Sequence, residues 1–251
     1  MSAPSDLFVK NRMLKGLPLS ERQLLASSCE RVEIHLGDVI DEVGRPIQFL
    51  FFPINSALSI INSPDQTHTV EVMVTGNKGC SGASIVLGND RSPCEVSTQI
   101  SGVAIRLAAS VFATHRSSLP YLEGALTRHN LLIMNLAVVS VGCSQFHSPA
   151  QRLARWLKTH WQRTGIDSFP FPSEFLSAQV GVASEIVKDL FTHFESLGLV
   201  QQGRNTVAIT NQTGLEQRSC HCYTKAKAST EDYLQCLADL TARHRISPET
   251  A

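Results

Sequence analysis

The periodicity of the apolar residues changes near residue 118, and this change limits what the chain can fold into. Before it, short segments rich in β-branched residues alternate with turn signals such as Leu36-Gly-Asp38 and Ser63-Pro-Asp65. After it, apolar residues recur every three or four positions from about Ser118 to Ser144, which predicts one helix of about seven turns. Many short strands predict a barrel or sandwich. The pattern therefore indicates a β domain followed by a long helix.

The β domain is expected between about residues 31 and 107. The predicted strands are Val32–Leu36, Phe49–Phe52, Ala57–Ile61, Thr69–Val74, Glu95–Ile100 and Val103–Leu107. Ahead of them, Ser20 and Gln23 have the spacing of a capping box, which predicts a short helix through Cys29.

The long helix carries a continuous apolar stripe. Its members are Leu122, Leu126, His129, Ile133, Leu136 and Ser140, with Leu132, Val139 and Cys143 beside them. A helix this apolar needs a partner, and pairing with its own copy in a second subunit is the simplest way to bury it. The alternative is a helix buried within a monomer.

The remainder of the chain has the order of a winged helix-turn-helix. A helix with Pro in its first turn is expected from Ser148 to about Arg163, followed by a loop. The segments after the loop are a short helix Ser173–Val180, a turn at Gly181, a helix Ala183–Leu197, and a hairpin of Leu199–Gln202 with Thr206–Thr210. In the tail, a helix is expected to begin at Ser229–Asp232, with an apolar face of Tyr233, Leu234, Leu237, Leu240 and Thr241.

Composition excludes several classes of protein. The 22 basic and 22 acidic residues cancel, so binding of nucleic acid by bulk positive charge is not expected. The N-terminus lacks a signal-peptide core, Leu131–Cys143 is too short to span a bilayer, and the seven cysteines are odd in number and mostly scattered. We expect a cytoplasmic protein with reduced thiols and no membrane partner. Since no nucleophile–base pair, P-loop or HExxH motif is present, we do not expect an enzyme.

Three segments resemble the Crp/Fnr family of bacterial transcription regulators. They are the strand-turn-strand Leu36–Gly44 with its two spaced glycines, Gly79–Ser92, which is similar to a cyclic-nucleotide phosphate cassette, and Phe169–Asp189, which resembles the helix-turn-helix. The run Ser148–Leu157 and the ending Ser219-Cys-His-Cys-Tyr223 are also typical of one branch. The resemblance covers about Leu14 to Tyr223.

This resemblance implies an α+β fold: an N-terminal β-roll of the cyclic-nucleotide-binding jelly-roll type, a long dimerisation helix and a C-terminal winged helix-turn-helix. The implied domains are a β-roll sensor domain at 1–117, the dimerisation helix at 118–146, the DNA-binding domain at 147–223, and a tail with an amphipathic helix at 224–251.

In the cassette, the resemblance makes Gly79, Gly82, Ala83, Arg91 and Ser92 the effector-pocket candidates. Backbone N–H groups and an arginine hold the phosphate in such a pocket. The glutamate that would accept the ribose hydroxyl is replaced by Ala83, which leaves that hydroxyl unpaired at a cost of roughly 1–3 kcal/mol. We therefore do not expect cyclic AMP as the effector. Alternatively, Arg91 is a structural arginine that pairs with Asp90 or Glu95.

Other sensor chemistries find little support in the sequence. An iron–sulfur cluster near the N-terminus needs several cysteines, and Cys29 is alone in the first seventy residues. His35, His68, His115 and His129 are available as haem ligands, but a single histidine is more often a polar or packing residue. Cys220-His-Cys222 has soft ligands but lacks two more at workable spacing. No metal or cofactor is therefore predicted.

The DNA-binding candidates are Ser173, Ser184, Glu185, Lys188, Asp189 and Arg204. Well-studied members of the family have arginines at the positions that match Ser184 and Asp189, and the predicted recognition helix carries one basic residue against three acidic ones. Further phosphate contacts are expected from Arg152, Arg155, Lys158 and Arg163. The resemblance implies a homodimeric regulator that binds a palindromic operator and contacts RNA polymerase. The alternative is a regulator-derived protein that has lost specific DNA binding and acts through protein partners.

Overall fold

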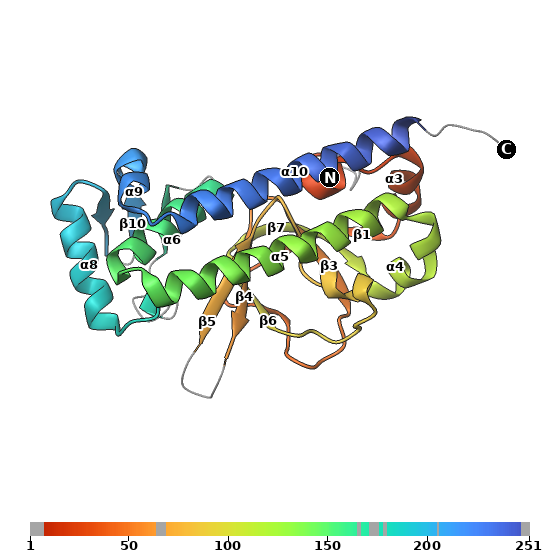
Figure 1. The fold of residues 1–251 in the computed structure, drawn as a ribbon. Helices are drawn as coiled ribbons and strands as arrows, with labels where there is room; N and C mark the ends of the chain where they lie inside the picture. The colour runs from red at the N-terminus through yellow and green to blue at the C-terminus, as the bar shows by residue number, and fades with distance from the viewer. Residues whose placement is uncertain are drawn as a thin grey trace. The chain divides into compact units, whose positions relative to one another are not determined.

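The structure is a computed structural model, and it describes residues 8–63, 69–164, 167–170, 176–177, 180–204 and 206–246. The chain forms two compact units (Figure 1). Unit 1 comprises residues 1–60, 73–134 and 229–251, and unit 2 comprises 61–72 and 135–228. The boundaries fall within two strands and two long helices, so each of these elements contributes to both units.

The helices are α2 (Arg12–Lys15), α3 (Leu19–Ala26), η1 (Ala83–Leu87), α4 (Ala109–His115), η2 (Arg116–Ser118), α5 (Pro120–Phe146), α6 (Pro149–Thr164), α8 (Ser184–Ser196), α9 (Gln212–Arg218) and α10 (Cys222–Ile246). The strands are β1 (Cys29–Ile34), β2 (Val39–Asp41), β3 (Phe49–Pro53), β4 (Ala57–Asn62), β5 (Val70–Thr75), β6 (Glu95–Ile100), β7 (Gly102–Ala108), β8 (Ser168–Pro170), β9 (Val200–Gln202) and β10 (Thr206–Ile209).

The N-terminal strands form two sheets, in the orders β1-β7-β3 and β2-β6-β4-β5. The β1/β7 and β3/β7 pairs are antiparallel, as expected for strands joined by short turns. Inward-facing residues such as Leu50, Phe52, Ile105 and Leu107 are buried and supply the core. The six strands predicted from the sequence are all present, which confirms the α+β fold with an N-terminal β domain.

The start of α5 is fixed by a buried carboxylate from α3. The two oxygens of Glu21 accept hydrogen bonds from the backbone N–H groups of Tyr121 and Leu122, at 2.7 and 3.0 Å. These N–H groups have no partner within their own helix, and a negative charge is favourable at this end of the helix dipole. This explains why Glu21, an acidic residue only 2% exposed, is tolerated in the core.

The exposed apolar face of α5 differs from the one predicted. Leu122, Leu126, His129 and Leu136, all members of the predicted stripe, are buried within the chain. Four large apolar residues in contact with solvent lie on the roughly opposite face of the helix: Leu131, Met134, Val138 and Val141, which we call the exposed stripe. Phe146, the last residue of α5, is also exposed. The predicted stripe is therefore a core-facing surface.

Among the described residues, α5 is also the one helix with the length and composition to cross a membrane. A single helix of this kind is weak evidence for a membrane span, because the core helix of a soluble protein passes the same test.

In unit 2, the winged-helix elements follow from local sequence signals. Ser148 and Gln151 form a reciprocal capping box at the start of α6, with the Gln151 N–H bound to Ser148 Oγ and the Ser148 N–H bound to Gln151 Oε1. β9 and β10 pair as the predicted hairpin. The core of this unit gathers Leu153, Leu157, Val187, Phe191, Phe194, Val207 and Leu215.

Several local predictions were wrong. Ser20 and Gln23 do not start α3, whose first residue is preceded by Pro18. The expected loop before Phe171 contains β8, which pairs with β10, and α9 was not predicted. The tail helix does not begin at Ser229, since α10 runs without interruption from Cys222.

Candidate nucleic-acid interface and effector pocket

The helix α8 has a buried face and a polar outer face. Val187, Phe191 and Phe194 point into the core of unit 2. Their spacing leaves the opposite face to solvent, where Glu185, Lys188 and Asp189 are exposed and Ser184 is half-buried. Four predicted DNA-binding residues thus lie together at the N-terminal end of one helix.

The chain enters α8 through a tight turn. Gly181 has a φ of +68°, a left-handed conformation that costs glycine little, and its N–H binds the carbonyl of Ser177 at 2.8 Å. Ala183 precedes the helix, and an alanine side chain cannot accept a hydrogen bond from the free N–H groups. Glu185 lies in the first turn, where its charge is favourable to the helix dipole. The remaining candidate, Ser173, lies outside the described residues.

The basic side chains predicted to contact phosphate differ in their exposure and in their partners. Arg204, in the turn between β9 and β10, is exposed, whereas Arg152 donates a hydrogen bond to the carbonyl of Ser144. Lys158 is 7% exposed and pairs with the carboxylate of Glu216 at 3.1 Å, so its expected role as a phosphate ligand is wrong. For Arg163, side-chain placement lies outside the described residues.

The far end of α8 is tied to the hairpin by an acidic residue. Glu195 accepts hydrogen bonds from the backbone and side chain of Gln202, at 2.8 and 3.0 Å. These bonds lower the pKa of Glu195. One of the three acidic charges on α8 is therefore committed to holding the hairpin in place.

In unit 1, the side chains of Arg91 and Ser92 in the cassette are hydrogen-bonded to nearby carbonyl groups. Arg91 is exposed and donates to the carbonyl of Gly44 at 2.8 Å, while the hydroxyl of Ser92 donates to the carbonyl of Cys94 at 2.7 Å. This outcome favours the structural interpretation of Arg91, although its partner is a carbonyl and not Asp90 or Glu95. Gly82 has a φ of +71° and precedes η1, in which Ala83 is buried.

The space facing the cassette is filled by side chains from α5 and α10. A Cβ at Gly79 would collide with the ring of His129, whose Nε2 lies 3.1 Å from the carbonyl oxygen of Cys80. The ring of Tyr233 contacts His129 at a centroid distance of 5.6 Å, and Asn130 donates to the carbonyl of Ala83. The sequence placed His129 and Tyr233 on apolar helical faces, but not against the cassette.

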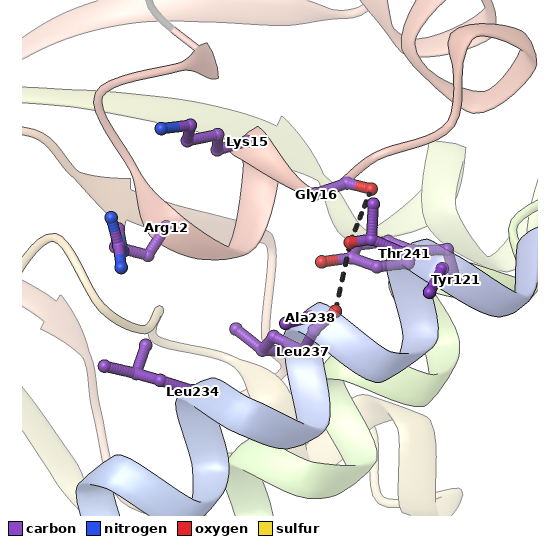
Figure 2. Close-up of a pocket in the computed structure, with 9 residues that line it drawn as sticks. Arg12, Lys15, Gly16, Tyr121, Leu234, Leu237, Ala238 and Thr241 are labelled. Atoms are coloured by element: carbon purple, nitrogen blue, oxygen red, sulfur yellow. Dashed lines mark hydrogen bonds between the residues drawn. The ribbon is translucent and has the colours of Figure 1, made fainter. Parts of the chain in front are cut away.

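A separate cavity of about 570 Å³ lies in unit 1 between α2 and α10 (Figure 2). Arg12 and Lys15 line it from α2, and Leu234 and Leu237 line it from α10. Thr241 closes one side by donating to the carbonyl of Gly16 at 3.3 Å. No cassette residue lines this cavity within the described part of the chain.

Solved structures share this architecture. A protein assigned to the Crp/Fnr transcriptional regulators in Eubacterium rectale has a TM-score of 0.66 and 12% identity, over 83% of this chain and 98% of that one. The chain has the Crp/Fnr fold. A CRP-family transcriptional regulator of Thermus thermophilus gives a TM-score of 0.59 at 12% identity, over 76% of this chain and 96% of that one.

The c-di-GMP responsive global regulator CLP of Xanthomonas campestris gives 0.58 at 16% identity, over 76% of this chain and 97% of that one. No protein-family model matches the sequence, and no curated protein matches it significantly. The resemblance seen in the sequence is thus confirmed as a shared fold with these transcriptional regulators.

Proposed function

We propose that this protein is a cytoplasmic, homodimeric transcription regulator that binds a palindromic DNA operator. The observation that carries the proposal is the outer face of α8 within a Crp/Fnr fold, since this helix leaves Glu185, Lys188 and Asp189 exposed at its N-terminal end. A recognition helix reads base edges in the major groove with side chains at this end. Arg204 on the hairpin is placed for a phosphate contact.

The exposed stripe of α5 supports the dimer. Leu131, Met134, Val138 and Val141 are 52–68% exposed and recur every three or four residues on one face. This is the spacing of a two-helix seam, in which the same surface of each copy faces the other. Operator palindromy follows from the two-fold symmetry of such a dimer.

The effector is not cyclic AMP under this proposal. A cyclic nucleotide needs a buried phosphate clamp and an acceptor for its ribose hydroxyl, whereas Arg91 is exposed and bound to Gly44, and Ala83 offers no side-chain acceptor. His129 also occupies the space in front of Gly79. RNA polymerase remains the expected protein partner of an activator built on this fold.

A specific observation favours a second candidate, a regulator-derived protein without specific DNA binding. The exposed end of α8 carries Glu185 and Asp189 against Lys188, and negative charge is unfavourable near phosphates. Arginine paired with guanine is the commonest specific contact, and α8 contains no arginine.

A salt titration of DNA binding separates the two candidates. Fluorescent duplexes from the region upstream of the gene, and a shuffled duplex of equal length, are titrated with the full chain at several salt concentrations. The regulator predicts that the upstream duplex binds at least about tenfold tighter than the shuffled one at physiological salt. Equal and weak binding of both duplexes supports the second candidate.

A further inference from the structure

Four metal-binding side chains from three parts of unit 2 meet in one place. They are Cys143 near the end of α5, His147 just after it, Cys220 between α9 and α10, and Cys222 at the start of α10. Their donor atoms all lie within 4.8 Å of one another. The Sγ atoms of Cys143 and Cys220 are 3.4 Å apart, and Cys222 Sγ is 3.6 Å from His147 Nδ1.

Local structure explains how the four side chains are oriented, two from each segment. Cys143 and His147 are four residues apart, and the His147 N–H binds the Cys143 carbonyl at 3.2 Å, so both side chains project from the same side of one helical turn. Cys220 and Cys222 flank the residue that leads into α10, and the Tyr223 N–H binds the Cys220 carbonyl at 2.9 Å. The turn brings their two sulfur atoms to the same side, while His221 between them is exposed.

The surroundings suit a bound cation better than free thiols alone. The three cysteines are 1–8% exposed and form a small buried cluster against Val139, whereas His147 is half-buried. The Sγ atoms of Cys143 and Cys220 lie 3.4 Å apart, close enough to share a single proton. A cation at this point would take the place of the proton that the two sulfurs share.

We propose that Cys143, His147, Cys220 and Cys222 bind a single zinc ion. Three cysteines and one histidine are a common ligand set of structural zinc, and four ligands close a tetrahedral site. A Zn–S bond of about 2.3 Å implies S–S distances of about 3.7 Å around a tetrahedral ion. The Cys143–Cys220 distance of 3.4 Å is within a few tenths of an ångström of this value. All four donor atoms lie within 4.8 Å of one another, so binding the ion needs ligand shifts of no more than about 1 Å.

The compactness of the cluster distinguishes a single ion from an iron–sulfur cluster. In a cluster, the ligands bind different iron atoms and are spread further apart than around one ion. The net charge also fits, because three thiolates and one Zn²⁺ leave one negative charge, and Arg155 acts electrostatically on both Cys143 and Cys220. The ion would hold the end of α5 to the start of α10 and to the segment that follows α9.

The experiment measures metal in the full chain purified with a non-chelating reductant. Zinc and iron are quantified by mass spectrometry in the wild type, in Cys220→Ser/Cys222→Ser and in His147→Gln. The matched controls are His221→Gln, between two proposed ligands, and Cys236→Ser, a partly exposed thiol on α10 outside the cluster. Circular dichroism checks folding. Wild type is also loaded with Co²⁺ in place of the native metal, because its visible absorption spectrum reports the ligands without the need for a variant.

The proposal predicts one zinc ion per chain in the wild type and both controls, and loss of most of it in the double cysteine variant. Cobalt-loaded wild type should show the visible bands of tetrahedral Co²⁺ with thiolate ligands, and His147→Gln should retain metal with a shifted spectrum. Wild type that binds no zinc under reducing conditions overturns the proposal. So do iron with acid-labile sulfide, a Cys143–Cys220 disulfide that persists in metal-free protein purified with the reductant, and equal zinc in the double variant.

Discussion

The substitution Val138→Asp should separate the dimer without unfolding the chain. Val138 is 68% exposed on α5, and its neighbours in the exposed stripe are 52–65% exposed. Burying a whole side chain of this kind is worth roughly 1.5–3 kcal/mol, so covering the exposed part of each gives about 1–2 kcal/mol. Eight such side chains from two copies supply roughly 8–16 kcal/mol, against an association cost of about 4–15 kcal/mol.

The two-fold axis makes one substitution act twice. Each dimer would gain two carboxylates in a dry seam and lose two apolar contacts, which together cost several kcal/mol. The dimer dissociation constant should therefore rise by at least about a hundredfold. Leu126 belongs to the stripe predicted from the sequence but has no exposed surface, so Leu126→Asp would place a charge in the core and destabilise the fold instead.

Sedimentation equilibrium over a dilution series measures the effect, with circular dichroism and thermal melting as folding checks. Asn135→Asp is the control, because it adds the same charge to an exposed position that flanks the exposed stripe, where a two-helix seam commonly carries charged residues. We expect wild type and Asn135→Asp to be dimers and Val138→Asp to be a folded monomer. A dimeric Val138→Asp protein, or a monomeric wild type at the same concentrations, would refute the reasoning.

The remaining predictions concern Asp41, the zinc site, α8 and the cassette. Burial raises the pKa of Asp41 from 3.8 to about 6, so the folded state binds a proton more tightly than the unfolded state, and the free energy of unfolding falls as the pH rises through this range. Asp41→Asn should remove this pH dependence and stabilise the folded protein by about 2–3 kcal/mol at pH 7, as measured by urea unfolding. Chelation of metal should lower the melting temperature of wild type and leave Cys220→Ser/Cys222→Ser unchanged. Asp189→Arg should raise affinity for most DNA sequences and steepen the salt dependence by about one unit in a binding titration. Calorimetry with cyclic AMP should detect no micromolar binding, and a micromolar dissociation constant would contradict the account of Ala83.

Local sequence patterns were enough to predict the longer elements, but not several short ones or the outward face of α5. The strand segments and α8 were found because β-branched runs and the spacing of Val187, Phe191 and Phe194 are local signals. The outward face of α5 was missed because apolar residues lie on more than one side of this helix, and only the fold shows which side the core covers. α9 and β8 are short, and their stability comes from packing and pairing with distant segments.

For the candidate sites too, features that lie within one segment could be predicted from the sequence, whereas contacts between distant segments could not. The exposed residues of α8 follow from one segment and its helical period. The zinc cluster joins residues 77 positions apart, Cys143 and Cys220, so the Cys220-His-Cys222 motif seemed incomplete until the fold supplied Cys143 and His147. In the cassette, Ser92 and Arg91 have the residue types of an anion site, but their hydrogen bonds go to nearby carbonyls.

The most direct test of the proposed regulator is a binding selection over duplexes with randomised half-sites, carried out with wild type and Glu185→Ala. A carboxylate accepts a hydrogen bond from the cytosine amino group, so Glu185 should read one position in each half-site, with roughly 1–3 kcal/mol of discrimination. Wild type should enrich a palindromic sequence, and Glu185→Ala should relax the preference at that one position. Identical sequence preferences in the two proteins would show that Glu185 does not read a base and acts only as a favourable charge at the end of the helix. The absence of any enriched sequence with wild type would contradict the assignment as a DNA-binding regulator.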